Sequence, residues 1–409
     1  MNDRSTPETP IDTKHTTCCI VGGGPAGAVL ALLLARQGVA TTLLELHRDF
    51  DREFRGDTLH PSVMEIMERL GLAEPLLELP HTQLRRIQIQ TETGMVTMAD
   101  FSRLRTKYPY ITLLPQVKFL EFIIAEAKRY PHFELVMGAN AQELVEEDGK
   151  VCGVRYRGHG GWHEVRSSLT VGADGRFSRL RQLSGFTAVA TSPPMDILWF
   201  RVSRQADDPE GVGLLARARG GRLLAIIDRR DYWQLGYVIV KGSYQALRDA
   251  GIEGLRASIA ELAPEFADRT DELQDWSQIS LLSVKSDRLT RWYCPGLLLI
   301  GDAAHIMSPV GGVGINYAIQ DAVVAANVLA APLKGDRLTV ADLAKVQRQR
   351  ELPTRVIQTA QTFIQKRIIA TALDGDRTLS PPAFLRLPVL RDVPANLIGF
   401  GIRRVYPQL

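Results

Sequence analysis

The sequence predicts an α/β fold in which a mostly parallel, three-layer sheet is interleaved with an antiparallel sheet and followed by C-terminal helices. Apolar runs near residues 16–46 and 297–331 alternate with glycine-rich turns and helix-like segments, which is typical of parallel βαβ units. Between them, residues 196–242 alternate apolar and polar side chains, as antiparallel strands with one covered face do. Beyond residue 343, apolar residues recur at helical spacing, so we expect helices there.

Composition and charge support a folded chain of two or three domains. The 409 residues are 45% hydrophobic and 23% charged, with a formal net charge of +3. These values are ordinary for globular proteins, and the charge is too nearly neutral to indicate a nucleic-acid partner. The charge is uneven, because residues 345–409 hold 11 Lys and Arg against 4 Asp and Glu. This basic tail is either a solvated helix face or a weak surface for anionic partners, including peripheral contact with a membrane.

The cysteines and the N-terminus bear on the compartment. The four cysteines form no C-x-x-C pattern, which argues against a zinc site or a disulfide framework and favours the reducing cytoplasm. Residues 1–15 are polar, so we expect a disordered leader rather than a secretory signal. The apolar run Ala28–Ala35 has eight residues, far fewer than the roughly 20 of a membrane span, and we expect no span.

A glycine-rich turn between a strand and a helix is the first chemical motif. Thr16–Val21 is strand-like, Gly22–Gly27 follows as GGGPAG, and Ala28–Gln37 is an apolar, helix-like run. A second apolar run carries Glu45, 18 residues past Gly27. This order of strand, G-x-G-x-x-G turn, helix, strand and acid is the dinucleotide-binding fingerprint of a Rossmann-like domain. An accidental glycine turn is the alternative.

Each residue of this fingerprint has a physical task. Gly22 permits the tight turn, and Gly24 lets the backbone approach a pyrophosphate. Gly27 lets the helix pack close to the strand while its N-terminal amides face the anion. Glu45 would accept hydrogen bonds from an adenosine ribose and would repel a 2′-phosphate. The sequence therefore predicts that this domain binds FAD or NAD rather than NADP.

Two later aspartates follow buried, strand-like runs. Asp174 comes after Ser168–Ala173, and Asp302 comes after Leu297–Ile300 and before the glycine-rich stretch Pro309–Asn316. Ligands of open α/β sheets bind at the carboxyl ends of the strands. Taken singly, either aspartate has the alternative of a helix cap or a left-handed turn.

The three segments GGGPAG, VGADGRFSRLR and GDAAHIMSPVGGVGIN stand in this order along the chain. In them the sequence resembles the class A flavoprotein monooxygenases, the para-hydroxybenzoate hydroxylase-like family, over roughly residues 16–335. The resemblance implies one FAD, no separate NAD(P)H domain and an inserted substrate sheet. It also implies hydroxylation of an aromatic or electron-rich small molecule, in which NADPH or NADH transiently reduces the flavin and O₂ adds at C4a as a hydroperoxide.

The resemblance also assigns individual positions. The first motif, Ala26 included, would hold the pyrophosphate, and Asp302 would bind the ribityl chain. Pro309 would wall the substrate pocket and Arg55 is a further catalytic candidate, whereas His305 belongs to the structural part of its motif. The helix after the third motif would aim its N-terminus at flavin N1 and C2=O, where reduced flavin is negative. The cofactor positions are Gly22, Gly24, Ala26, Gly27, Glu45, Arg55, Gln116, Asp174, Asp302, Gly311, Gly314, Ile315 and Asn316.

The substrate side is predicted from period-two alternation. Antiparallel strands are indicated at residues 196–204, 221–230 and 232–242, with further strands within 79–100. Trp199 and Arg201 share one strand face, as do Trp233 and Tyr237 on another strand. We expect these four side chains to line the substrate pocket, with ordinary packing on the sheet as the alternative.

The domain boundaries follow from the positions of these motifs. The first domain is visited three times and the substrate sheet twice. We predict a leader at residues 1–15, an FAD-binding domain at 16–78, 101–185 and 281–342, a substrate domain at 79–100 and 186–280, and a C-terminal helical segment at 343–409.

Alternatives remain open at the level of function and of single residues. Flavin-dependent epoxidases, isoprenoid-type reductases and halogenases have similar motifs, although the W-x-W-x-I-P segment typical of halogenases is missing from this sequence. A flavin-binding redox sensor is the non-enzymatic alternative. Arg55 has the alternative of a plain surface residue, and Gln116 that of an ordinary polar residue at a helix start.

Overall fold

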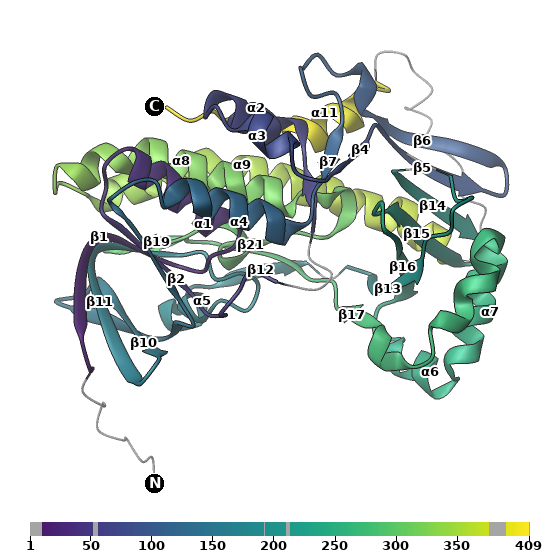
Figure 1. The fold of residues 1–409 in the computed structure, drawn as a ribbon, viewed down its shortest axis with the longest axis horizontal. Helices are drawn as coiled ribbons and strands as arrows, with labels where there is room; N and C mark the ends of the chain where they lie inside the picture. The colour runs from purple at the N-terminus through teal and green to yellow at the C-terminus, as the bar shows by residue number, and fades with distance from the viewer. Residues whose placement is uncertain (1–9, 52–55, 192, 210–212, 376–389, 409) are drawn as a thin grey trace, which may run out of the picture.

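The computed structural model describes residues 10–51, 56–191, 193–209, 213–375 and 390–408. Two large sheets lie at opposite ends of the molecule, and long helices join them (Figure 1). One sheet is mostly parallel and the other mostly antiparallel. This arrangement confirms the predicted α/β fold class.

The first sheet has eight strands, and five of them pair in parallel. Its path runs β19-β20-β11-β1-β2-β8, and β10 and β9 extend it from β11 as an antiparallel flap. Because β20, β11, β1, β2 and β8 pair in parallel, their carboxyl ends meet at one edge. The strands are β1 (Thr13–Val21), β2 (Thr41–Glu45), β8 (Phe133–Met137), β9 (Asn140–Glu147), β10 (Lys150–Gly158), β11 (Gly161–Gly172), β19 (Tyr293–Cys294) and β20 (Leu297–Leu299).

Helices cover this sheet in a layer that is itself buried. Helix α1 (Pro25–Arg36) is apolar on all sides, and its residues from Ala26 to Ala35 are buried, as expected for a helix packed on every face. It contacts α4 (Gln116–Ala127) and α8 (Gly314–Lys334). Helix α8 in turn runs beside α9 (Val340–Ile364) across the molecule (Figure 1).

Helix α8 combines unusual length with low polarity. With the turn before it, Val310–Lys334 is long and apolar enough to cross a membrane by length and composition alone, and 78% of its apolar window is buried inside the protein. A core helix passes the same test, and α8 is packed between α1 and α9.

The second sheet has seven strands in the order β17-β13-β16-β15-β14-β5-β6. Its pairs are antiparallel except β14 with β5. The three strands predicted between residues 196 and 242 are present as neighbours in this sheet. The strands are β5 (Arg86–Thr91), β6 (Gly94–Asp100), β13 (Met195–Ser203), β14 (Leu214–Arg219), β15 (Arg222–Asp228), β16 (Tyr232–Val240) and β17 (Ser280–Leu282).

Smaller elements connect the two sheets. Two three-stranded sheets have the orders β12-β18-β21 and β3-β7-β4. Their strands are β3 (Thr58–Leu59), β4 (Thr82–Leu84), β7 (Ile111–Leu113), β12 (Ala188–Thr191), β18 (Ser286–Leu289) and β21 (His305–Ile306). The other α-helices are α2 (Pro61–Arg69), α3 (Ala73–Leu77), α5 (Arg179–Ser184), α6 (Tyr244–Asp249), α7 (Ile252–Leu262), α10 (Ala370–Ala372) and α11 (Val393–Phe400). The 3₁₀ turns are η1 (Phe101–Arg103), η2 (Pro264–Glu272), η3 (Trp276–Gln278), η4 (Gly301–Ala303) and η5 (Val310–Gly312), and a π-helical turn, η6, covers Gln365–Ile369.

Three predicted boundaries need correction. Strand β1 begins at Thr13 instead of Thr16, because the three extra residues pair with β11, so residues 13–15 belong to the sheet. Strand β17 straddles the boundary predicted at 281 and pairs with β13 of the second sheet. Helix α9 begins at Val340 rather than 343, behind a capping box formed by Thr339 and Asp342.

Candidate active site

The first motif forms the turn between β1 and α1 and touches the second motif. Gly22 has a φ of +104°, and a Cβ there would lie 2.5 Å from the Ala173 carbonyl oxygen. A Cβ on Gly27 would lie 1.9 Å from the Gly22 carbonyl oxygen. Both distances are far inside van der Waals contact, so only glycine lets β1, β11 and the start of α1 approach this closely.

Gly24 marks open space at the N-terminus of α1. It is the N-cap residue, and a Cβ there would meet no atom of the described chain within 4 Å. Helix α1 also begins without a side-chain cap or an acidic residue in its first turn, in contrast to the capping box of α9. Open space beside uncapped helix amides is the environment that an anionic pyrophosphate requires.

Glu45, at the end of β2, braces the glycine turn. Its buried carboxylate accepts hydrogen bonds from the Gly23 amide at 2.8 Å and from the His47 amide at 2.9 Å. The contact of this carboxylate with an adenosine ribose stays a prediction. The structure adds that the same group fixes the backbone of the first motif.

The third motif packs directly against the first. Strand β20 leads into turn η4, where a Cβ on Gly301 would lie 3.2 Å from the Ala26 Cβ and 3.3 Å from the Ala318 Cβ. Asp302 is half-buried at the second position of this turn. Because β1, β11 and β20 are neighbours in the parallel sheet, all three motifs meet at its carboxyl edge.

A buried ion cluster behind this turn was missed by the sequence reasoning. The Asp321 carboxylate accepts hydrogen bonds from the Gly301 amide at 3.0 Å, from His305 Nε2 at 2.5 Å and from Arg350 Nε at 2.7 Å. Asp321, His305 and Arg350 are almost entirely buried. The signal in the sequence was an aspartate inside the apolar run AIQDAVVAA, since a lone acid in a buried helix needs a charged partner.

The cluster also settles what His305 does in this structure. Its Nε2 is bound to Asp321, and its ring lies 5.0 Å from the Trp292 ring. Burial acts to raise the pKa of Asp321, but the charges and hydrogen bonds of His305 and Arg350 outweigh it and lower that pKa. The histidine is therefore a buried support for the third motif and is not exposed on the surface of the protein.

The turn after Pro309 brings its backbone close to Thr58. Gly311 and Gly312 have φ of +78° and +63°, and a Cβ on Gly312 would lie 2.9 Å from Thr58 Oγ1. The Thr58 hydroxyl donates to the Gly312 carbonyl at 2.8 Å. Helix α8 then begins at Gly314 without a side-chain cap or an acid in its first turn. It offers a second uncapped N-terminus, on the helix predicted to point at flavin N1 and C2=O.

The Asn316 side chain is used inside the protein, and the predicted place of this residue beside the cofactor stays a prediction. Its Oδ1 accepts from the His60 amide at 2.8 Å, and its Nδ2 donates to the carbonyls of Thr58 and Gly312 at 3.3 and 3.2 Å. The side chain is 1% exposed, so it joins strand β3 to α8 and is not directed to a ligand. Ile315, by contrast, is half-buried, and its Cδ1 would lie 3.5 Å from a Cβ on Gly56.

Gln116 holds the segment next to Arg55, which itself lies outside the described residues. The Gln116 side chain donates to the Gly56 carbonyl and its backbone amide donates to Asp57 Oδ1, both at 3.3 Å. Asp57 pairs at 2.8 Å with Arg229, which lies in the turn between β15 and β16 of the second sheet. Burial raises the pKa of Asp57 although Arg229 opposes it. These contacts tie the chain beside Arg55 to both domains.

Asp174 of the second motif is a helix-capping residue in this structure. Its Oδ1 accepts from Ser178 Oγ at 2.5 Å, and its Oδ2 accepts from the Leu180 amide at 3.1 Å. Ser178 is the N-cap of α5. Burial raises the pKa of Asp174. The side chain supports the start of α5, which is the alternative left open from the sequence.

The predicted substrate residues fall on opposite faces of the second sheet. The register pairs Leu198 with Tyr237 and Val202 with Trp233, so Trp233 and Tyr237 share the face that α7 and η2 cover. There Trp233 Nε1 donates to Asp208 at 2.6 Å. The assignment of Trp233 and Tyr237 to the pocket is therefore wrong, because both belong to the core beneath α7.

Trp199 lies on the opposite face, toward the turn after Pro309. It packs against two apolar clusters, one of which includes Ile398 of α11 and the other Val310 of η5. A Cβ on Gly311 would lie 3.6 Å from Ile398. Pro309 is half-buried at the start of this turn. Apolar side chains of the sheet, η5 and α11 thus gather here, and we call this apolar region the chamber that the substrate is predicted to occupy.

Arg201 extends beyond this chamber to the rim. It is exposed, and its guanidinium lies 4.8 Å from the centre of the Tyr232 ring. Its charge also acts to lower the pKa of Asp57, so both residues contribute to the same charged rim between the domains.

The residues present fit FAD. Uncapped N-termini of α1 and α8 suit the anionic pyrophosphate and the negative charge of a reduced flavin. The space at Gly24 admits a ligand that a side chain would block.

Comparisons with known proteins agree with this geometry. The family model of the FAD binding domain matches residues 15–358. The 6-methylpretetramide 4-monooxygenase of Streptomyces rimosus is 34% identical over 399 residues, which are 97% of this chain and 94% of that protein. The anhydrotetracycline monooxygenase of the same organism is 26% identical, over 74% of this chain and 60% of that protein.

Solved structures share the fold. The p-nitrophenol 4-monooxygenase from Pseudomonas putida DLL-E4 has a TM-score of 0.78 at 20% identity, covering 96% of this chain and all of that one. The anhydrotetracycline hydroxylase from Streptomyces rimosus has a TM-score of 0.74 at 26% identity, covering 94% and 76%. The chain belongs to the FAD-binding-domain family of aromatic monooxygenases, and it is an FAD-dependent, NAD(P)H-using enzyme that hydroxylates an aromatic or electron-rich small molecule.

Proposed function

We propose that the substrate is a multi-ring aromatic of the tetracycline type rather than a single-ring phenol. The observation that carries this proposal is the 34% identity, over 97% of the chain, to a protein named 6-methylpretetramide 4-monooxygenase. Two further relatives are named for anhydrotetracycline. The apolar chamber supports it, because Trp199, Val310 and Ile398 offer hydrophobic surface from three separate elements.

The chain's own residues bind, orient and exclude water. Bound FAD would supply the oxygen-transfer chemistry. The α1 N-terminus would hold the pyrophosphate, and the α8 N-terminus would stabilise negative charge on the ring system without a titrating side chain. Pro309 and Trp199 would confine the aromatic substrate in a dry chamber, which limits side reactions with water. The Asp57–Arg229 pair at the rim would fix the relative position of the two domains.

The test compares substrates of different size on the purified, FAD-loaded enzyme. We expect a tetracycline-type phenol to stimulate NAD(P)H oxidation at least tenfold more, in kcat/KM, than a single-ring phenol, because each additional buried ring adds roughly 1.5–3 kcal/mol. With ¹⁸O₂ the product should carry one labelled oxygen atom. Equal stimulation by the single-ring phenol would refute the substrate proposal, and label arriving from water would refute oxygen transfer.

We infer that the enzyme works in the cytoplasm. All four cysteines are free, as expected where thiols are kept reduced. Fractionation of the producing cells, with flavin content and activity followed together, tests this inference. Activity recovered outside the cytoplasmic fraction would contradict it.

A further inference from the structure

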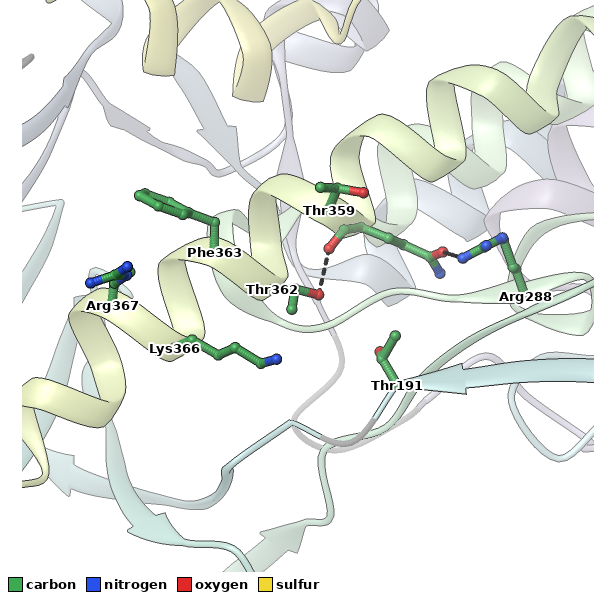
Figure 2. A pocket seen from close by; sticks show the side chains of 8 residues that line it. Thr191, Arg288, Thr359, Thr362, Phe363, Lys366 and Arg367 are labelled. Carbon is green, nitrogen blue, oxygen red and sulfur yellow. Dashed lines mark hydrogen bonds between the residues drawn. The ribbon is translucent and has the colours of Figure 1, made fainter.

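A basic pocket lies outside the chamber, where α9 passes the small sheet β12-β18-β21. It measures about 410 Å³ and lies between Thr191, Arg288 and the end of α9. Figure 2 shows Lys366, Thr362 and Arg288 around a common hollow, with Phe363 and Arg367 on the adjoining side of the helix. None of these residues was assigned to the flavin or to the substrate.

The three cations of this pocket have no acidic partner in the described part of the chain. Lys366 and Arg367 make no ion pair there, and the side chain of Arg288 donates only to the neutral Gln358 Oε1 at 3.4 Å. The residues that line the pocket include no Asp or Glu. The threonine hydroxyls of the pocket donate to backbone carbonyls, so the guanidinium and ammonium groups are the donors that would recognise a phosphate.

The exposed ring beside these cations adds an aromatic surface. Phe363 is 52% exposed and lines the same pocket. Lys366 and Arg367 follow Phe363 along the chain and lie in the π-helical turn Gln365–Ile369. Such turns are frequent at functional sites. A phosphate flanked by a flat apolar face suits a nucleoside phosphate better than a free phosphate ion.

The inner face of the same helix holds the turn that walls the active site. Gln361 Nε2 donates to the carbonyls of Ser308 and Val310, each at 2.8 Å, and Gln365 Nε2 donates to Ser308 Oγ at 2.5 Å. A ligand bound on the outer face therefore lies one helix away from Pro309. That position suits the distal half of a reductant whose reactive end must reach the flavin.

We propose that this pocket binds the 2′-phosphoadenosine end of NADPH and makes the enzyme prefer NADPH over NADH. The choice of the 2′-phosphate follows from charge, because an acid accepts the free ribose hydroxyl of NADH whereas cations accept a 2′-phosphate. The proposal rests on the enzyme's use of a pyridine nucleotide. It does not depend on which aromatic compound is the substrate.

The test uses the FAD-loaded enzyme and charge reversals at the pocket. We expect the wild type to have a higher kcat/KM for NADPH than for NADH. Lys366→Glu and Arg367→Glu should each lower kcat/KM for NADPH about tenfold or more through KM, since a charge-assisted contact contributes roughly 1.5–3 kcal/mol. Values for NADH should stay unchanged. Arg348→Glu, an exposed cation on α9 outside the pocket, is the matched control.

Two further measurements separate this proposal from the proposed function. Calorimetry with 2′-AMP needs no aromatic substrate, and we expect binding to the wild type that is lost in Lys366→Glu. Flavin content and photochemical reduction of the flavin should be equal in all variants, which shows that each variant is folded. Lys366→Gln, which removes the charge without reversing it, should also raise KM for NADPH and weaken 2′-AMP binding. Equal use of NADH and NADPH by the wild type, or unchanged NADPH kinetics in both reversals, would overturn the assignment.

Discussion

Removal of the Asp321 carboxylate should lower the stability of the folded protein. It is fully buried, and it pairs with the fully buried Arg350 at 2.7 Å. Arg350 Nη1 and Nη2 find no hydrogen-bond partner in the described chain, so Asp321 is the carboxylate that compensates this buried charge. Breaking a buried pair by deleting one partner costs about 3–5 kcal/mol. We therefore expect Asp321→Ala to lower the free energy of unfolding of the apoprotein by about that amount.

A second substitution tests the cause of this loss. In Asp321→Ala the penalty is the uncompensated charge of Arg350, so Asp321→Ala/Arg350→Met should recover a large part of it, as replacement of whole buried pairs by apolar residues often does. Glu351→Ala removes an acid next to Arg350 that is only half-buried and accepts from Gln347. This control should stay within about 0.5 kcal/mol of the wild type.

Urea unfolding near pH 7.5, followed by tryptophan fluorescence and by circular dichroism, measures these differences. The pKa of Asp321 is lowered in the fold, so its stabilisation is complete above the unfolded carboxyl value and is lost only as pH falls through the folded value. The assay pH therefore reports the full effect. A loss below about 1 kcal/mol in Asp321→Ala, or a double variant no more stable than the single one, would refute the reasoning.

Three further predictions rest on other parts of the site. Gly24→Ala should leave the free energy of unfolding of the apoprotein within about 0.5 kcal/mol of the wild type but lower its flavin content. Gly27→Ala should destabilise the apoprotein itself, because its Cβ would lie 1.9 Å from a carbonyl oxygen. Equal flavin content in Gly24→Ala and the wild type would contradict the predicted pyrophosphate site at Gly24. Burial lowers the pKa of His60 to about 4, so between about pH 6.5 and 4 the unfolded chain binds a proton at His60 that the folded chain does not. The free energy of unfolding should therefore fall by about 3 kcal/mol as pH drops through this range. In acid unfolding, His60→Asn should show a smaller fall of stability with pH. Trp199→Ala should raise KM for the aromatic substrate severalfold while flavin is retained. Tyr237→Phe, on the covered face of the sheet, should leave KM unchanged. Equal KM values in Trp199→Ala and the wild type would remove Trp199 from the chamber.

The glycine turn and the acid at the end of β2 could be predicted because they depend on residues that are adjacent in the chain. The glycine pattern was informative because Gly22 needs a positive φ and Gly27 needs the absence of a Cβ, and both are properties of adjacent chain. The same holds for the acid at the end of β2. The boundaries were less accurate, since residues 13–15 become strand only by pairing with the distant β11.

The substrate face could not be predicted because it depends on register. Alternation along one strand shows that Trp233 and Tyr237 point the same way. It does not show whether they share a face with Trp199, because that follows from the pairing of Leu198 with Tyr237. A shift of one residue would have moved the whole set to the other face. The Asp321 cluster was hidden for a related reason, since its members come from three distant segments.

The cations of the basic tail have different roles, which its net charge alone does not show. Arg350 neutralises Asp321 in the core, and Arg404 pairs with Glu65 of α2 at 3.0 Å, so part of the positive charge attaches the C-terminal segment to the more acidic body. Lys366 and Arg367 differ, because in the described chain they face a pocket instead of a carboxylate. If these cations bind a 2′-phosphate as proposed, charge reversal removes that contact and changes the nucleotide kinetics. Neither residue lies in the three motifs predicted to hold FAD, so flavin content should stay constant.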